Sequence, residues 1–176
     1  MKIYVVNQDI VSVAEKDVLK IPNAEIFDVE EIPDNYKIYD FIDGKFVLNK
    51  EKEQKLKELE AKAKIDAKYR ACAKYIYTHY PQTKQNSDLA DKLYYENLLK
   101  AQGVQNLEAD IAARVQSFYD GKSLEGVLAD VAVEHKEAYE QLVKVGIRVA
   151  WVQQCKAELK AAIAESREPN FPNYPL

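Results

Sequence analysis

Hydrophobic and polar positions follow two different patterns along this chain, and the change falls near Asn49. Before it, short runs of β-branched and aromatic residues alternate with turn residues, as in an antiparallel sheet. After it, Ala, Leu, Glu and Lys dominate, which favours helices. The sequence therefore predicts an α+β fold in four parts: a small antiparallel β-meander head (1–49), a long connector helix (50–80), an α-helical bundle or body (81–167) and an extended tail rich in proline and aromatic residues (168–176).

The strongest local signal is the dipeptide Asp43-Gly44 in the head. Both residues tolerate the positive φ values of a type I′ turn, so they predict a hairpin in which Phe41 pairs with Phe46. The complete set of expected strands covers residues 3–6, 10–13, 24–29, 36–42 and 45–48.

The two faces of this hairpin differ in character. One face is aromatic and aliphatic and is expected to be the core: Tyr39, paired with Leu48, together with Phe41 and Phe46. The other face is mixed and is expected to be partly solvated. Its apolar members are candidates for contact with a partner: Ile38, Ile42 and Val47.

Capping residues predict where the helices begin and end. Asn49 can cap a helix that Pro81 stops, and Asn86 or Ser87 can cap a second helix that runs to about Ala101. Asn106 and then Ser123 can cap two further helices, the first over residues 107–119.

Residues 134–166 predict one long helix, or two helices kinked near Gly146. Its apolar residues keep the 4-3 spacing of a bundle or coiled-coil seam: Ala138, Leu142, Val145, Val149, Val152, Leu159 and Ile163. Ile147 and Trp151 lie on the opposite side. A helix that is apolar nearly all round is central to a bundle or covered by another subunit.

Composition excludes several classes of partner. The chain has 25 Lys+Arg against 29 Asp+Glu, a net charge of −4, so it lacks the basic surplus expected of a nucleic-acid binder. No apolar run approaches the roughly 20 residues that span a bilayer, so no membrane partner is expected. Residues 1–6 lead directly into Asn-Gln-Asp, which argues against a cleavable signal peptide.

The residues that commonly carry chemistry are few and widely spaced. Cys72 and His79 are seven residues apart, and Cys155 and His135 are elsewhere, so the close ligand pairs of a structural zinc site are missing. The two cysteines are predicted to be reduced core thiols. The sequence also lacks a Gly-x-Ser-x-Gly motif and a glycine-rich phosphate loop. We therefore expect no enzyme activity, no cofactor and no metal.

Tyrosines concentrate in one part of the chain, where six of the 12 fall between residues 69 and 95. Tyr75, Tyr77 and Tyr80 cannot all point the same way from one helix, so at least one should reach solvent or another chain. Two interpretations stay open: the rings fill the helix packing with their hydroxyls at its rim, or they form a partner surface. Phe171 and Tyr174 in the tail are further partner-binding candidates.

The first sixty residues resemble a known family. They combine Met-Lys-Ile-Tyr (1–4) and Ile-Val-Ser-Val (10–13) with Ala-Glu-Ile-Phe-Asp-Val-Glu-Glu-Ile-Pro (24–33). The stretch Asp-Gly-Lys-Phe-Val-Leu-Asn (43–49) then runs into a Glu/Lys helix. This order resembles the small N-terminal module of bacteriophage and prophage tail-fibre assembly proteins. The resemblance implies a chaperone or adaptor that binds a trimeric tail-fibre or receptor-binding protein. Such a protein would act in the bacterial host cytoplasm or stay on the virion.

A rival hypothesis assigns the chain to a structural class. The seam over residues 134–166 would then hold copies together as a homo-oligomeric tail or virion component.

Overall fold

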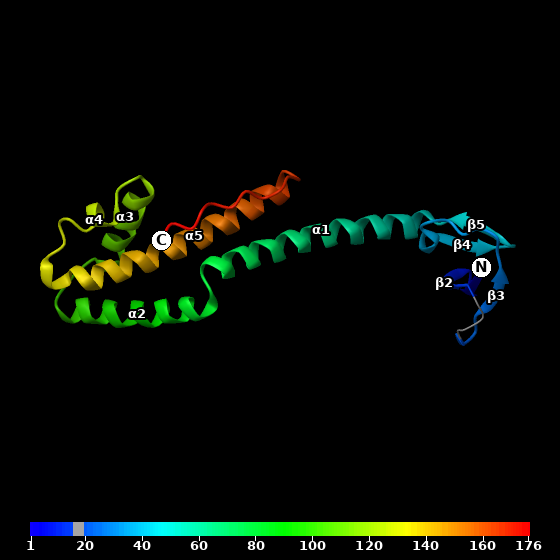
Figure 1. Ribbon diagram of the computed structural model, residues 1–176, viewed down its shortest axis with the longest axis horizontal. Helices are drawn as coiled ribbons and strands as arrows, with labels where there is room; N and C mark the ends of the chain where they lie inside the picture. Colours follow the sequence, from blue (N-terminus) through cyan, green and yellow to red (C-terminus); the bar gives the residue numbers. More distant parts are fainter. Residues whose placement is uncertain (16–19) are drawn as a thin grey trace. The chain divides into compact units, whose positions relative to one another are not determined.

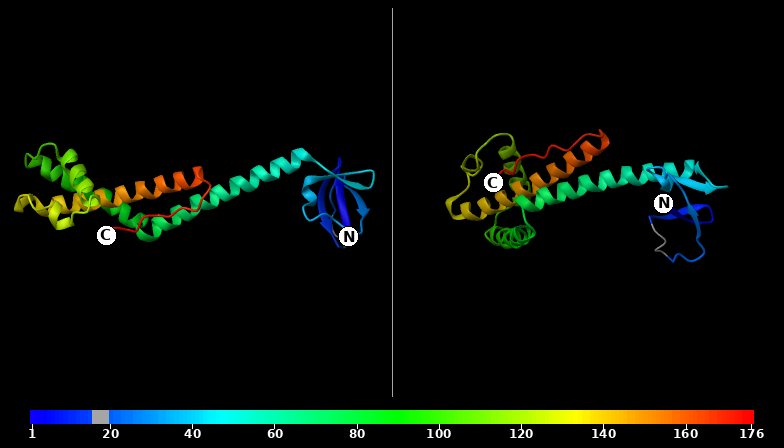
Figure 2. Two further views of the ribbon diagram at one scale, coloured as in Figure 1. Left: turned by 90° about the horizontal axis from the view of Figure 1, so that it is seen from above. Right: turned by 45° about the vertical axis from the view of Figure 1, so that its right-hand side comes forward.

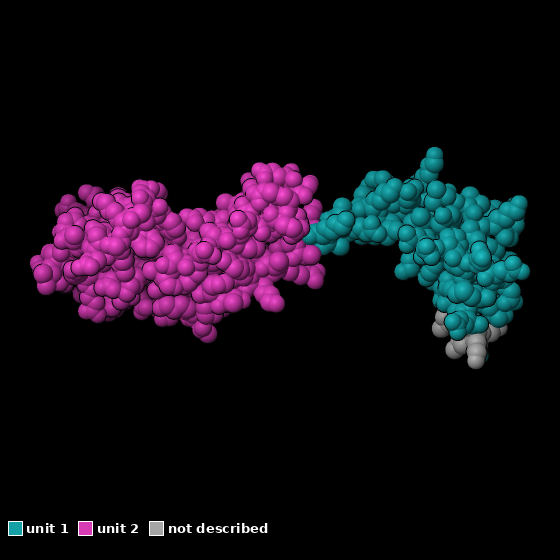
Figure 3. All heavy atoms as spheres, turned by 45° about the horizontal axis from the view of Figure 1, so that its top comes forward, with its two compact units in different colours: residues 1–64 teal, residues 65–176 magenta. Residues whose placement is uncertain are grey.

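The computed structural model describes residues 1–15 and 20–176 and confirms the α+β class, with strands first and helices after them (Figure 1). The chain divides into two compact units, Met1–Lys64 and Ile65–Leu176 (Figure 3). The division falls inside the predicted connector helix, so the first half of that helix belongs with the head. The predicted tail belongs with the helical unit.

The first unit contains a five-stranded antiparallel sheet in the order β3-β1-β2-β4-β5. Its strands are β1 (Lys2–Val6), β2 (Asp9–Ala14), β3 (Glu25–Asp28), β4 (Tyr39–Ile42) and β5 (Lys45–Leu48). The predicted strand over 36–42 is too long, because Tyr36–Ile38 forms a 3₁₀ turn and β4 begins only at Tyr39.

The predicted hairpin is confirmed in its turn and its register. Asp43 and Gly44 have φ of 50° and 78°, and Phe41 pairs with Phe46. Phe41 is buried, with the rings of Phe27 and Phe46 centred 4.8 and 5.3 Å from its own. Leu48 pairs with Tyr39 as expected, but it is exposed because it ends an edge strand, which corrects its placement in the core.

The hairpin is tied to the helix that follows by a small polar cluster. Asn49 Oδ1 accepts hydrogen bonds from the backbone N–H groups of Glu51 and Lys52 at 3.0 and 3.2 Å, which confirms the predicted cap. Asn49 Nδ2 donates to Asp40 Oδ2 at 2.9 Å, and Lys52 Nζ donates to Asp40 Oδ1 at 2.6 Å. The hydrogen bond from Lys52 is the main reason why the pKa of Asp40 lies below its ordinary value. Asp40 therefore fastens the first helical turn to the sheet.

The helices are α1 (Lys50–His79), α2 (Gln82–Ala101), α3 (Leu107–Tyr119), the short α4 (Leu124–Val127) and α5 (Lys136–Ala164), which follows the 3₁₀ turn Val133–His135. The N-cap expected for α2 at Asn86 or Ser87 is wrong by five or six residues, since Pro81 occupies that position. Proline is tolerated at a helix start because it has no N–H to satisfy. Gln85 Nε2 donates to the Tyr80 carbonyl at 2.7 Å across the tight junction between α1 and α2.

Helix α5 runs unbroken through Gly146, so the alternative of a kink is wrong. A Cβ atom at this glycine would lie 2.6 Å from Cγ2 of Val115 on α3, which means that Gly146 permits close approach of the two helices. Leu142 and Val145 of the predicted seam are buried within the chain, whereas Val149 is exposed. Much of the seam therefore packs inside the protein.

Two hydrophobic clusters hold the second unit together. One joins α2, α3 and the first half of α5 and includes Leu99, Leu107 and Ile147. The other joins the end of α1 to the second half of α5 and includes Ile76, Trp151 and Leu159. Ile147 and Trp151, on the side of α5 opposite the predicted seam, are both fully buried. Helix α5 is thus the central helix of this unit.

Candidate protein-interaction surfaces

The tail is ordered against the second unit and covers part of its aromatic cluster. It runs beside α5 and the end of α1, as both views of Figure 2 show. The Pro172 carbonyl accepts hydrogen bonds from Trp151 Nε1 at 2.8 Å and from the Tyr75 hydroxyl at 3.2 Å. Phe171 stacks on Tyr75 with ring centroids 5.1 Å apart, and Tyr174 meets the edge of Trp151 at 5.0 Å.

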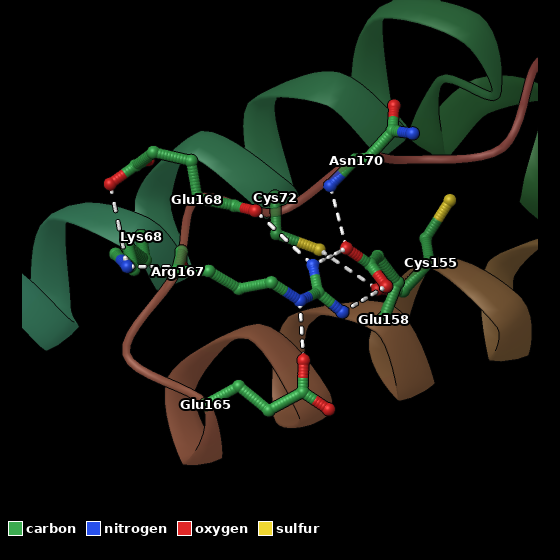
Figure 4. A network of polar contacts seen from close by, with 8 residues as sticks. All are labelled: Lys68, Cys72, Cys155, Glu158, Glu165, Arg167, Glu168 and Asn170. Carbon is green, nitrogen blue, oxygen red and sulfur yellow. Dashed lines mark hydrogen bonds and ion pairs between the residues drawn. The ribbon is translucent and has the colours of Figure 1, made fainter.

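A polar network fixes the beginning of the tail (Figure 4). The guanidinium of Arg167 donates to both carboxylate oxygens of Glu158 at 2.5 and 3.0 Å, and the Asn170 backbone N–H donates to Glu158 at 2.6 Å. These contacts, the hydrogen bonds from Arg167 first, lower the pKa of Glu158 to about 2. Lys68 Nζ on α1 donates to the Arg167 carbonyl at 2.5 Å. The tail thereby joins α1 to α5.

A buried ionic group lies between α2 and α5. Asp88 is 1% exposed, and its Oδ2 accepts hydrogen bonds from Arg148 Nη1 at 2.6 Å and from the Tyr80 hydroxyl at 2.8 Å. Lys84 Nζ lies 2.8 Å from Oδ1. Burial raises the pKa of Asp88, but the hydrogen bonds from Lys84, Tyr80 and Arg148 outweigh it and hold the pKa below its ordinary value.

Of the partner-binding residues predicted on α1 and in the tail, most are covered within the chain and one is exposed. Tyr80 is buried beside Asp88, which removes it from any partner surface in this structure. Tyr75 is half-buried beneath Phe171, and Tyr174 is half-buried against Trp151. These rings fill packing within the chain, because the tail returns to cover them. Tyr77 alone among the three helix tyrosines points outward, with 53% of its surface exposed.

The three partner-binding residues predicted on the hairpin differ in their exposure. Val47 is exposed on β5, whereas Ile38 and Ile42 are half-buried. Since β5 ends the sheet order, its outer edge has no strand neighbour among the described residues. Val47 and Leu48 therefore form an exposed apolar edge, defined here as the β5 edge.

Sequence reasoning missed an exposed apolar surface on the outer side of α2. Leu89, Leu93 and Tyr94 expose 59%, 56% and 63% of their surface, and Leu98 is also exposed. Of the 13 exposed residues on this helix only Lys92 and Lys100 are charged. The helical spacing of these residues could have revealed this surface. It places them on the side of α2 away from the buried residues Asp88 and Leu99.

The cysteines and histidines form no site among the residues that the structure describes. Cys72 and Cys155 are both buried, and burial raises the pKa of the Cys155 thiol to about 11. The described chain holds no group of three side chains suited to a metal ion. No described helix is long and apolar enough to cross a membrane.

Comparison with protein families, curated proteins and solved structures gives no match to this chain.

Proposed function

We propose that this chain is a protein-binding assembly chaperone or adaptor for a phage or prophage tail-fibre or receptor-binding protein. The observation that carries the proposal is the exposed apolar β5 edge on a head whose sequence resembles that of tail-fibre assembly proteins. The chain would work by binding a polypeptide, without forming or breaking a covalent bond.

A sheet edge suits this task for a physical reason. Fibre proteins rich in β-strands assemble slowly, and their unpaired strands are prone to aggregate while they wait for partners. An edge strand offers backbone N–H and C=O groups to such a strand, and exposed apolar side chains add contact area. Val47 and Leu48 provide that area at the end of β5.

The site of action follows from the same proposal. The chain would meet newly made fibre polypeptides in the cytoplasm of the bacterial host, and it would either leave the finished fibre or stay bound to the virion.

Binding can be tested with matched variants of the head. Val47→Lys places a charge on the β5 edge, whereas Val11→Lys places the same charge on β2, at a residue equally exposed (47% against 45%). A tail-fibre polypeptide is co-expressed with each tagged variant, and the amount that co-purifies is measured. We expect Val47→Lys to reduce it at least tenfold and Val11→Lys to leave it unchanged. Equal co-purification by both variants would refute a role for this edge.

A self-associating tail or virion component is the second candidate. The apolar, charge-poor outer side of α2 favours it, while the seam first considered on α5 is largely buried within the chain.

A further inference from the structure

The outer side of α2 lacks the charge that solvated helices of this chain carry. Residues 50–64 of α1 are the internal comparison: eight of their 12 exposed residues are charged. On α2 the two exposed charges, Lys92 and Lys100, both lie within 4 Å of the half-buried Glu96, so that side is apolar and carries few charges. Depletion of charge together with an exposed aromatic residue, here Tyr94, is typical of an interface core.

An apolar groove adjoins this side of α2. Ile111 and Val115 of α3 and Val145 and Val149 of α5 line it, and Lys92 and Glu96 form its rim. Leu89 and Leu93 lie one turn apart on α2, next to that rim, because residues three and four apart are neighbours on a helix. Figure 1 shows α2 alongside α5. One continuous surface thus holds a ridge of two leucines and a groove.

A ridge beside a groove can be self-complementary, which a two-fold interface requires. In a two-fold interface the same patch of both copies meets, so the ridge of each copy enters the groove of the other. Charge does not oppose this occupant. Each copy carries a net charge of −4, which opposes association through acidic surfaces, whereas the charge-poor side of α2 lets two copies meet with little repulsion.

We propose that α2 and the adjoining groove form a two-fold interface between two copies of this chain. The helix is about 30 Å long, so the contact falls among the smaller interfaces and its dissociation constant is expected in the micromolar range. This inference does not rest on the proposed binding of a fibre, because it concerns the chain alone.

The test is sedimentation equilibrium of the purified full chain over roughly 1 to 200 μM, a range that brackets a micromolar dissociation constant. Leu93→Glu places a charge on the ridge. Leu59→Glu is the matched control, because Leu59 is 64% exposed on α1 and lies outside the proposed interface. Leu89→Glu is a second ridge variant, and far-UV circular dichroism verifies that all variants fold.

We expect the wild-type mass to rise from 20.2 kDa toward twice that value with concentration. Both ridge variants should weaken dimerisation at least tenfold, and Leu59→Glu should match the wild type. A wild-type chain that stays monomeric at every concentration overturns the proposal, as do ridge variants that dimerise like the control. If a monomeric wild type loses fibre co-purification when Leu93 is replaced, α2 binds the fibre, and the proposed function stands without the dimer.

Discussion

The buried group around Asp88 makes a quantitative prediction about stability. Replacing Arg148 with Met keeps an unbranched apolar stem but removes the guanidinium that donates to Asp88 at 2.6 Å. Breaking a buried ion pair by removing one partner costs about 3–5 kcal/mol, because the other charge stays buried. Tyr80 and Lys84 still contact the carboxylate, so we place Arg148→Met at the lower end, about 3 kcal/mol.

The assay is urea unfolding at 25 °C, followed by the fluorescence of Trp151. This residue is the only tryptophan and lies in the same unit as the ion pair, so its signal reports on that unit and not on the head. A second variant isolates the cause. Adding Asp88→Asn to Arg148→Met removes the unpaired charge, so the double variant should be more stable than Arg148→Met alone.

Two outcomes would refute this reasoning. One is a loss below about 1 kcal/mol for Arg148→Met, the range of an exposed ion pair. The other is a double variant less stable than Arg148→Met, which would mean that the buried charge is not the source of the loss.

Two further predictions concern packing and pH. Gly146→Ala should lower the free energy of unfolding by about 1–3 kcal/mol, because the new methyl group would lie 2.6 Å from Val115 Cγ2. Adding Val115→Ala should restore most of that loss. An unchanged unfolding midpoint in Gly146→Ala would contradict the close approach of the two helices. The pKa of Glu158 is lowered to about 2, so the stability that its charge gives to the tail is fully present above pH ~4.5 and is lost as the pH falls toward 2. Trp151 emission should therefore shift to longer wavelength between these pH values as the tail detaches. The variant Glu158→Gln should show much of that shift already at pH 7. Identical pH profiles for the wild type and the variant would refute the role of Glu158.

Local chemistry made the head and most helix ends predictable. Asp43 and Gly44 determine the hairpin because few other residues adopt positive φ, and the pairing of Phe41 with Phe46 follows from a two-residue loop. The Asn49 cap could be read from its side chain and the polar turn after it. The start of α2 was missed because its first turn is polar and has no apolar period to mark it.

Contacts between distant residues were not accessible from local patterns. Asp88 and Arg148 are 60 positions apart, and in the sequence each resembles an ordinary solvated charge. Pro172 meets Trp151 only because the tail turns back along α5, a path that the extended character of the segment does not determine. The outer side of α2 was readable in principle, since Leu89 and Leu93 lie one turn apart on a side that exposes no acidic residue.

The yield of assembled fibre tests the central claim most directly. A tail-fibre polypeptide is expressed with and without this chain, and the soluble trimer is quantified by size-exclusion chromatography with light scattering. We expect the trimer to form in quantity only when the chain is present. Equal yields of soluble trimer in its absence would contradict the assignment of this protein to fibre assembly.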